Sequence, residues 1–331
     1  MTRRRYRAVL RALCVLALMA LSAACGGGAG GGDGSSGRSF LSIGTAPPGG
    51  AFFVVGGALA EVLNAQAGEN WSVTAEGTSG SQENIRRLAS GELDFALSNA
   101  AITYFGVRGT EGWDRAYPVR SVMTLAPNVA LFLARADSDV RTIADLRGKR
   151  VVVGPAGAGF EYFMRPLLAA HGLTYDDFTP LNATQSAAVD MLADGAASAA
   201  FIGGAVPTAS ITQASASMDV FFVPFDERAG ESLAAEYVFF SRATIPANTY
   251  RGQSEPFVGL DTGSMHLITS TDTDEDLVYR VTRALYEARA QVVQRHAAGN
   301  SINPTNVVRQ TGTEFHPGAI RYYQEIGIWP Q

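Results

Sequence analysis

Residues 43–50 read IGTAPPGG and residues 151–159 read VVVGPAGAG, and each stretch carries an apolar segment into a glycine-rich turn before a helical pattern. Downstream of each turn, a helix that ends at a glycine, Gly91 or Gly195, is followed by an apolar strand. Gly154 follows Gly44 by 110 residues and Gly195 follows Gly91 by 104, so the two halves share one plan. The sequence therefore predicts two α/β lobes, each with free backbone N–H groups at a helix start, where anions and carbonyl oxygens bind.

The length and composition fit this two-lobed plan. A chain of 331 residues is long enough for two domains with a core each, and 47% hydrophobic with 17% charged residues describes a folded protein.

The N-terminus has the pattern of a targeting segment. Five arginines precede the apolar run at residues 12–21, and small residues follow as far as Cys25. We interpret residues 1–24 as a lipoprotein signal peptide and Cys25 as the lipidated first mature residue, although the lipobox leucine lies one place further from the cysteine than usual. The alternative is an ordinary secretory signal that leaves Cys25 unmodified. Residues 25–38, rich in Gly and Ser, predict a flexible tether, so the expected location is extracytoplasmic, anchored to the cell membrane.

Cysteine usage and charge narrow the class further. Cys14 lies within the signal, so the mature chain keeps one of its two cysteines and contains no internal disulfide. Without the five signal arginines, 21 basic and 31 acidic residues remain, a net charge of −10. Such a surface argues against nucleic-acid binding.

The order of elements predicts where the lobes begin and end. We expect lobe I to comprise residues 39–130 and 239–331, and lobe II residues 131–238, joined by crossovers at residues 129–134 and 236–240. A long helix over residues 274–296 should bury one face against lobe I. This discontinuous plan predicts an α/β, two-lobed, periplasmic-binding-protein-like (type II) fold with hinge crossovers. Its ligand cleft would lie between the lobes, at the carboxyl ends of the strands.

Candidate ligand contacts follow from the turns and strand ends that should face this cleft. They are Thr45, Gly49, Phe52, Ser79, Gly80, Ser81 and Asn99 in lobe I, Gly157, Ala158, Gly159 and Phe160 in lobe II, and Tyr237 at the second crossover. Each has a plainer explanation. Phe52 suits the core, the serines suit a helix cap, the second glycine turn suits an ordinary strand-to-helix connection, and Asn99 and Tyr237 suit bonds to nearby backbone.

Catalytic motifs are incomplete, so we expect no catalytic residue, metal or cofactor. Asp261 begins the string DTGS of an aspartic protease, but no second such motif supplies the partner carboxylate. The four histidines lack metal-binding spacing, and residues 77–81, GTSGS, are not a nucleophile elbow. A dinucleotide-binding turn would need glycine where Tyr162 stands.

Several longer strings resemble the TAXI family, the extracytoplasmic solute receptors of TRAP transporters. Besides the turn at residues 43–50, they are GALAEVLN (57–64), ENIRRLASGELDFA (83–96), IADLRGKRV (143–151), ATIPANTY (243–250) and HPGAIRYY (316–323). The resemblance implies a receptor that passes a small carboxylate or amino acid to an ion-gradient-driven TRAP permease with fused small and large membrane subunits.

The chain departs from the TAXI pattern near the expected ligand. Residues 156–160 read AGAGF where the family often has PGSGT, and residues 52–54 read FFV where a tyrosine pair and proline are common. Residues 203–207 read GGAVP in place of Gly-Gly-His-Pro, which makes Gly204 and Val206 further candidate contacts. These changes predict a ligand with one carboxylate and a substantial apolar part.

The sequence leaves three classes of function to compare. We favour a solute receptor for a TRAP permease. A lipoprotein that senses its ligand for a membrane signalling partner is the alternative, and a hydrolase is disfavoured because the catalytic motifs are absent.

Overall fold

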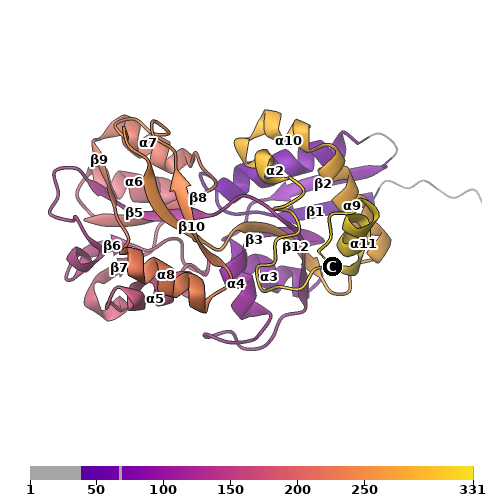
Figure 1. Cartoon of the computed structure of the whole chain (residues 1–331), viewed down its shortest axis with the longest axis horizontal. Helices are drawn as coiled ribbons and strands as arrows, with labels where there is room; N and C mark the ends of the chain where they lie inside the picture. Colours follow the sequence, from indigo (N-terminus) through magenta and orange to yellow (C-terminus); the bar gives the residue numbers. More distant parts are fainter. Residues whose placement is uncertain (1–38, 67–68, 331) are drawn as a thin grey trace, which may run out of the picture. The chain divides into compact units, whose positions relative to one another are not determined.

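A computed structural model describes residues 39–66 and 69–330, which belong to one compact unit, Arg38–Gln331. The predicted signal peptide, the tether and Cys25 lie outside the described residues. In the described part, two β-sheets with flanking helices form two halves, which we call the first and second lobe (Figure 1).

The first lobe is built on a sheet with strand order β2-β1-β3-β12-β4. β1 is parallel to β2 and β3, whereas β12 is antiparallel to both β3 and β4. Its strands are β1 (Ser39–Gly44), β2 (Trp71–Glu76), β3 (Phe95–Asn99), β4 (Val119–Thr124) and β12 (Met265–Ser270). Its helices are α2 (Ala51–Asn64), α3 (Ser81–Ala89), α4 (Ala100–Gly106), α9 (Glu275–Glu287), α10 (Arg289–Arg295), η3 (Ala297–Ser301) and α11 (Pro317–Glu325).

The second lobe is built on a sheet with strand order β10-β11-β5-β8-β6-β7, with β9 also paired to β5. Its strands are β5 (Val129–Arg135), β6 (Arg150–Val152), β7 (Thr179–Leu181), β8 (Ala199–Gly204), β9 (Val220–Val223), β10 (Phe240–Ile245) and β11 (Phe257–Thr262). Its helices are η1 (Ile143–Leu146), α5 (Glu161–Ala170), η2 (Tyr175–Asp177), α6 (Gln185–Ala193), α7 (Ala209–Ser217) and α8 (Glu227–Glu236).

The chain crosses between the lobes twice, and the second crossing differs from the sequence prediction. The first connects β4 to β5, close to the predicted boundary at residue 130. The second connects β11 to β12 through Gly263, not through residues 236–240, because β11 pairs with β5 in the second sheet. Gly263 has φ +110°, and a Cβ there would lie 2.6 Å from Ala101 N and Asn99 Oδ1. Only glycine fits this crossing without displacing α4.

The helix predicted over residues 274–296 is interrupted in the structure. Asp274 caps α9 by accepting a hydrogen bond from Leu277 N, and α9 ends at Ala288, after which α10 begins. Val278, Val281 and Leu285 are fully buried, as the helical spacing predicts. The break lets α10 pack against α2.

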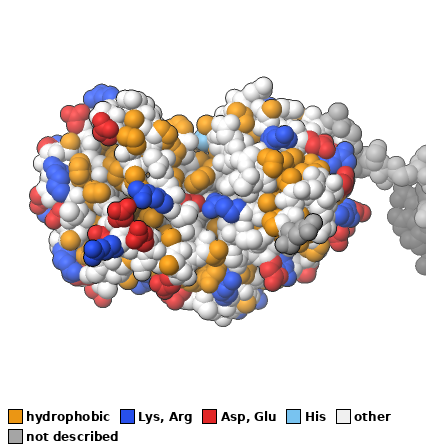
Figure 2. All heavy atoms as spheres, in the orientation of Figure 1, with side chains coloured by type: hydrophobic (Ala, Val, Ile, Leu, Met, Phe, Trp, Pro, Cys, Tyr) orange, Lys and Arg blue, Asp and Glu red, His pale blue; other side chains and the backbone are white. Residues whose placement is uncertain are grey.

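Buried apolar residues form a core on both faces of each sheet. One cluster is continuous from the first lobe, through Ile102 and Phe105, to Phe163 and Phe201 of the second lobe. The other two clusters each cover the remaining face of one sheet. The lobes are therefore joined by shared apolar packing as well as by two strands of chain, while Figure 2 shows a furrow between them on the surface.

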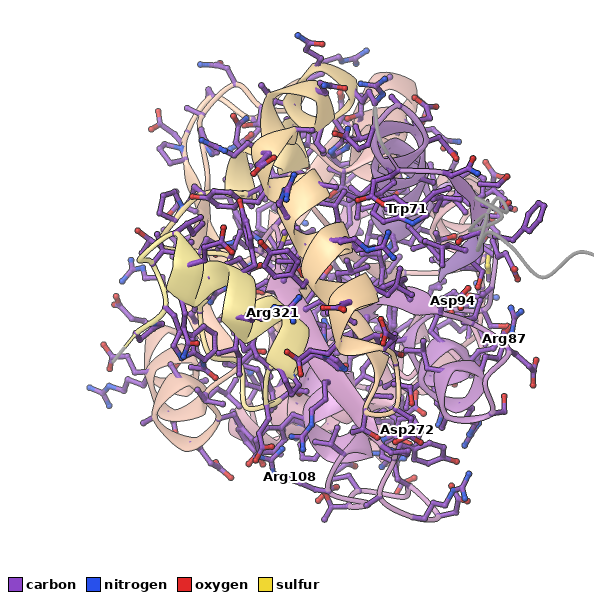
Figure 3. All side chains as sticks on the ribbon, turned by 90° about the vertical axis from the view of Figure 1, so that its right-hand side faces the viewer. Trp71, Arg87, Asp94, Arg108, Asp272 and Arg321 are labelled. Atoms are coloured by element: carbon purple, nitrogen blue, oxygen red, sulfur yellow. The ribbon has the colours of Figure 1, made fainter. Side chains whose placement is uncertain are left out.

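Surface ion pairs add little to this packing. Arg321 of α11 pairs with Glu275 at 3.2 Å and Asp276 at 2.7 Å in the first turn of α9, beside which it lies in Figure 3. Exposed pairs of this kind contribute well under about 1 kcal/mol each. Burial of Tyr322 and Tyr323 against the core holds α11 in place.

Candidate ligand-binding site

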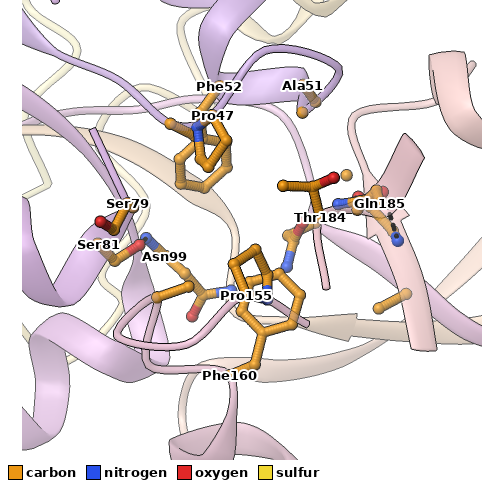
Figure 4. A pocket seen from close by; sticks show the side chains of 18 of the residues that line it. Pro47, Ala51, Phe52, Ser79, Ser81, Asn99, Pro155, Phe160, Thr184 and Gln185 are labelled. Carbon is orange, nitrogen blue, oxygen red and sulfur yellow. Dashed lines mark hydrogen bonds between the residues drawn. The ribbon is translucent and has the colours of Figure 1, made fainter. Parts of the chain in front are cut away.

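A pocket lies between the lobes and encloses about 660 Å³ of space free of atoms, part of it open to solvent (Figure 4). Both lobes contribute to its lining through turns that follow strands and through the first residues of helices. The first lobe supplies Ala46, Pro47, Pro48, Gly50, Ala51, Phe52, Ser79, Gly80, Ser81 and Asn99. The crossing and the second lobe supply Asn128, Ala130, Pro155, Ala158, Phe160, Phe163, Thr184, Gln185, Phe201, Gly203 and Gly204.

Two uncapped helix starts form the wall of the first lobe. Gly50 precedes α2 and Gly80 precedes α3, so neither helix receives a side-chain cap from the residue before it. The N–H groups of Ala51, Phe52, Ser81 and Gln82 find no hydrogen-bond acceptor within the described chain. These donors, together with the positive ends of the helix dipoles, suit a negatively charged or carbonyl oxygen.

Most hydrogen-bonding atoms of the polar side chains at the base of this wall already have partners within the protein. The Asn99 side chain caps α4 by accepting hydrogen bonds from Ala101 N and Ile102 N, and it donates to Gly263 O at 2.8 Å. Ser81 Oγ accepts a hydrogen bond from Asn99 N at 2.9 Å, and its own proton has no acceptor among the described residues. Ser81 is 4% exposed, so this hydroxyl is a buried donor at the pocket.

Asn128 stands at the end of the first crossing, and it bonds Thr262, which leads into the second crossing. Its side-chain nitrogen donates to Thr262 Oγ1 at 3.1 Å, while no donor reaches its side-chain oxygen within the described chain. Asn128 N donates to the buried carboxylate of Asp261, which also accepts hydrogen bonds from Ser264 and Arg309. Burial raises the pKa of Asp261, and these bonds oppose that rise. The pocket is therefore linked by hydrogen bonds to both crossings.

The wall of the second lobe is mainly apolar. Phe160 packs on Phe163 with ring centroids 5.2 Å apart, and Phe163 packs on Phe201 at 5.7 Å. Phe52 of the first lobe lies across the opening from Phe160 (Figure 4). The side chain of Gln185 is held by Gly203 O at 2.8 Å and by Ser210 Oγ, and Thr184 caps α6. No ionisable side chain is among the described residues that line the pocket.

Close approaches across the pocket explain two of its glycines. A Cβ on Gly204 would lie 2.7 Å from the Cβ of Ala51, and one on Gly80 would lie 3.3 Å from the Cβ of Ala158. Both have positive φ, +152° and +124°. A larger residue at either position would push the two lobes apart next to the ligand space.

Beside the pocket, Tyr162 of α5 enters an aromatic site of the first lobe. Its hydroxyl accepts a hydrogen bond from Gln82 Nε2 at 3.0 Å. Its ring stacks on Trp113 at 5.4 Å and 19°, and on Phe105 at 6.2 Å and 29°. Burial raises the pKa of Tyr162, so the phenol stays protonated at neutral pH. We call these four residues the aromatic latch.

The structure brings together eight of the residues that the sequence proposes as ligand contacts. These are Phe52, Ser79, Gly80, Ser81, Asn99, Ala158, Phe160 and Gly204, and all line the pocket.

Six other candidates lie off the pocket lining. Thr45 is fully buried and donates from Oγ1 to Glu76 O, and Gly157 is exposed. Gly159 packs against Ile102 and Tyr162, and Gly49 faces Ser186 across the edge of the cleft. Val206 packs in the core of the second lobe, and Tyr237 packs on Phe239 next to α8. Positive φ values account for the glycines at positions 49, 157 and 159.

Several lining residues were not proposed from the sequence. Thr184 and Gln185 follow β7 as Ser79 and Ser81 follow β2, so applying the two-lobe repeat to this turn would have found them. Asn128 stands at the first crossing, where a polar residue between two apolar strands is a usable signal. Phe163 and Phe201 carry no such signal, because both also pack in the core.

Comparison with known proteins places the chain in a family. Residues 43–327 match the model of the NMT1-like family. The chain belongs to the NMT1-like family. Its fold is similar to that of an alkanesulfonate-binding protein, SsuA from Xanthomonas axonopodis pv. citri bound to MOPS, at 18% identity, with 88% of this chain and 80% of that chain covered and a TM-score of 0.50. A protein from Bordetella bronchiseptica RB50 matches at 12% identity, with 88% and 90% covered and a TM-score of 0.53.

The periplasmic aliphatic sulphonate binding protein SsuA from Escherichia coli also matches, at 16% identity, with 88% of this chain and 84% of that chain covered and a TM-score of 0.49. The two-lobed, periplasmic-binding-protein-like fold predicted for this NMT1-like chain is confirmed. What the comparisons establish is the family and the fold. The TAXI assignment, the TRAP permease and the lipid anchor stay predictions.

The described residues hold no group of three or more His, Cys, Asp or Glu side chains placed to bind a metal ion. None of the helices that the structure describes has the length and apolar character needed to span a membrane.

Proposed function

We propose that this NMT1-like protein is an extracytoplasmic receptor that binds a small organic acid or amino acid between its lobes and delivers it to a membrane permease. The observation that carries the proposal is the pocket itself, formed by strand ends and uncapped helix starts of both lobes where two short crossings join them. A site divided in this way can close around its ligand by rotation at the crossings. The alkanesulfonate-binding protein that shares the fold is a ligand-binding protein by its description.

The identity of the permease is a finer part of the proposal. We infer a TRAP permease because the strings at residues 83–96 and 143–151 resemble those of TAXI receptors. Uptake of labelled ligand by vesicles that contain a fused TRAP permease should require this protein and an ion gradient. Uptake that needs ATP instead would contradict the TRAP assignment and leave the receptor role intact.

Anchoring through Cys25 is proposed from the N-terminal sequence. Cells fed labelled palmitate should label the protein, and a Cys25→Ala variant should lose both the label and the membrane association. Labelling of the variant would contradict this assignment.

An enzyme is disfavoured by the chemistry of the pocket. No described residue that lines the pocket is an acid, a base or a metal ligand that could activate a nucleophile. Ser81 Oγ accepts its hydrogen bond from the backbone N–H of Asn99, which cannot take up a proton.

The experiment that tests the receptor is recovery of a carried ligand. Protein purified from its own host should release one small molecule on denaturation, detected by mass spectrometry. Adding that molecule back to refolded protein should raise the melting temperature in a saturable way. Absence of both a released molecule and any stabilising metabolite would contradict the receptor function.

A further inference from the structure

The two crossings between the lobes lie side by side and pair with each other. Leu125 N donates to Met265 O at 2.8 Å, and Met265 N donates to Ala126 O at 2.9 Å. Further toward the second lobe, Thr262 N donates to Asn128 O at 3.1 Å. In the described part of the chain the backbone passes between the lobes through these two segments, so a rotation of one lobe against the other must bend both at once.

A third segment, residues 302–309, belongs to the first lobe and runs against the crossings. Val307 anchors it, because this side chain is fully buried in the first-lobe core. The side-chain nitrogen of Asn306 donates to Thr124 O at 3.1 Å and to Leu125 O at 3.0 Å, where the first crossing begins. The segment is therefore fixed to the first lobe and tied to the first crossing.

Arg309, at the end of this segment, reaches the second crossing. Its guanidinium donates to Ser264 Oγ and pairs with the carboxylate of Asp261, with 3.4 Å between Nη2 and Oδ2. Ser264 Oγ donates to the same carboxylate at 2.5 Å, and Asn128 N donates to its other oxygen at 2.9 Å. Asp261 lies on β11 and is 1% exposed, so a buried acidic side chain of the second sheet faces a cation of the first lobe across the joint.

We propose that Asn306 and Arg309 form a hinge clamp, which holds both crossings as they stand in the structure and thereby favours the arrangement in which the lobes enclose the pocket. This inference rests on the proposed receptor function, in which lobe rotation opens and closes the site. Thr124 Oγ1 donates to Arg309 O at 2.9 Å, so Arg309 stays with the first lobe while Asp261 moves with the second. Opening must therefore weaken the pair that Arg309 makes with Asp261.

The two contacts of the hinge clamp differ in chemistry but act on the same joint. A cation that only neutralised Asp261 would need no partner on the other crossing, whereas the uncharged Asn306 bonds that crossing from the same segment. The clamp also reaches the pocket, because Asn128 lines it and bonds Asp261. A molecule that contacts Asn128 is thus one hydrogen bond from the Arg309 partner.

The test measures the separation of the lobes without any added ligand, after partial unfolding and dialysis to remove carried molecules. Nitroxide labels are placed at two exposed positions, Gln213→Cys on α7 and Gln294→Cys on α10, and Cys25→Ala removes the thiol of the mature chain. Figure 1 shows these helices at the tops of the two halves. Pulsed electron–electron double resonance gives the distribution of distances between the labels. Arg309→Gln should raise the ratio of long to short separations about tenfold, because a hydrogen-bonded charge pair is lost from the closed form.

Arg120→Gln is the matched control for this variant. The side chains of Arg120 and Arg309 are both 34% exposed, and Arg120 pairs with Glu314 on the same C-terminal stretch without touching either crossing. Its ratio of separations should stay within twofold of the wild type. An equal rise in Arg120→Gln and Arg309→Gln would show a general loosening of the first lobe and overturn the hinge clamp.

The contact with the first crossing is tested separately. Asn306→Ala should raise the ratio at least threefold, since its bonds to two crossing carbonyls are lost. Asn300→Ala is its control, because that side chain bonds Ala297 O within η3, and its ratio should not change.

Asp261→Asn shows whether Arg309 acts through the carboxylate. Alone it should raise the ratio about as much as Arg309→Gln does, and in its background Arg309→Gln should add less than twofold. A full tenfold rise in that background would contradict action through Asp261. Should Arg309→Gln not fold, Asn306→Ala and Asp261→Asn decide the proposal.

An unchanged ratio in Arg309→Gln or in Asn306→Ala would overturn the hinge clamp, and so would wild-type protein found wholly at the long separation. None of these measurements involves a ligand. The receptor function is therefore decided separately, by the molecule that the protein carries from its host.

Discussion

At the scale of single residues, Asn99 shows how one side chain joins the pocket to the crossings. Its amide oxygen caps α4, and its amide nitrogen reaches the carbonyl of Gly263 on the second crossing. The sequence suggests two roles for Asn99, a polar ligand contact or a partner of nearby backbone. The structure favours the backbone role, because both the oxygen and the nitrogen of the side-chain amide make hydrogen bonds to backbone groups.

Replacing Asn99 by alanine should therefore cost stability. Loss of the cap and of the bond to Gly263 leaves buried groups unpaired, so we expect Asn99→Ala to lower the free energy of unfolding by about 3 kcal/mol. Urea unfolding followed by circular dichroism measures this. Asn300→Ala, at an exposed position, is the matched control and should cost under about 1 kcal/mol. A similar loss in both variants would show that Asn99 has no special role.

His266 gives a prediction about pH. It is fully buried on β12, and burial lowers its pKa to about 3. An unfolded histidine titrates near 6.5, so below that pH the unfolded chain binds a proton that the folded chain does not. Stability should fall as the pH drops from 6.5 toward 3, by up to about 1.4 kcal/mol per pH unit for this one group.

The comparison with a His266→Gln variant isolates this effect. Between pH 7 and pH 5, the wild type should lose about 2 kcal/mol more than the variant in urea unfolding. Burial also lowers the pKa of His296 and His316, but these residues are common to both proteins and cancel in the difference. Parallel pH profiles would contradict the assignment of the buried neutral imidazole.

At the scale of elements, the sequence predicts those whose ends carry strong signals. Gly91 and Gly195 correctly mark the region where α3 and α6 end, and the apolar run of β5 marks a fully buried strand. Three α-helices were missed, α4, α8 and α11. α4 has only seven residues after its cap Asn99, and α8 lies in a polar stretch interrupted by Gly230. Their caps, Asn99 and Asp226, were present in the sequence, but apolar periodicity was too weak to reveal the helices.

The second crossing was misplaced for a tertiary reason. Residues 236–240 are apolar enough for a crossing strand, yet their apolar side chains belong to the shared core, where Phe239 packs on Phe105. The hairpin of β10 and β11 joins the second sheet because β11 pairs with β5, more than a hundred residues earlier in the chain. Local sequence does not encode that pairing.

The aromatic latch on α5 predicts a change in ligand affinity with little change in folding. If the lobes separate in the absence of ligand, the bond between Tyr162 and Gln82 exists only in the closed form, and contacts made only in that form add to ligand affinity. Tyr162→Phe keeps the stacked ring, so we expect unfolding to change by under about 1 kcal/mol while Kd rises about fivefold.

Calorimetry and urea unfolding on the same samples separate the two effects. Tyr175→Phe is the control, because the Tyr175 hydroxyl contacts Met164 within the second lobe. Its ligand affinity should match the wild type. Equal affinities for both variants would mean that the latch does not open when the ligand leaves.

At the scale of the whole molecule, a closing receptor should be stabilised by its ligand according to occupancy. At a free ligand concentration 100 times Kd, the free energy of unfolding should rise by about 2.7 kcal/mol, which corresponds to a melting shift of about 5 °C or more. Differential scanning calorimetry across ligand concentrations measures this. A shift that is independent of concentration would contradict binding to the folded state.

Trp113 provides an internal measure of lobe movement. It belongs to the first lobe, stacks on Tyr162 of the second, and its Nε1 is buried without a hydrogen-bond partner in the described chain. Opening the cleft would expose the indole to water and shift its emission to longer wavelength, and ligand should reverse the shift.

Since Trp71 and Trp329 would mask this signal, the double variant Trp71→Phe/Trp329→Phe isolates it. In that background, adding Tyr162→Ala should produce long-wavelength emission before and after ligand addition, because the ring that covers Trp113 is gone. If calorimetry reports binding while Trp113 emission stays constant, the shared core holds the lobes fixed and the ligand enters without hinge motion.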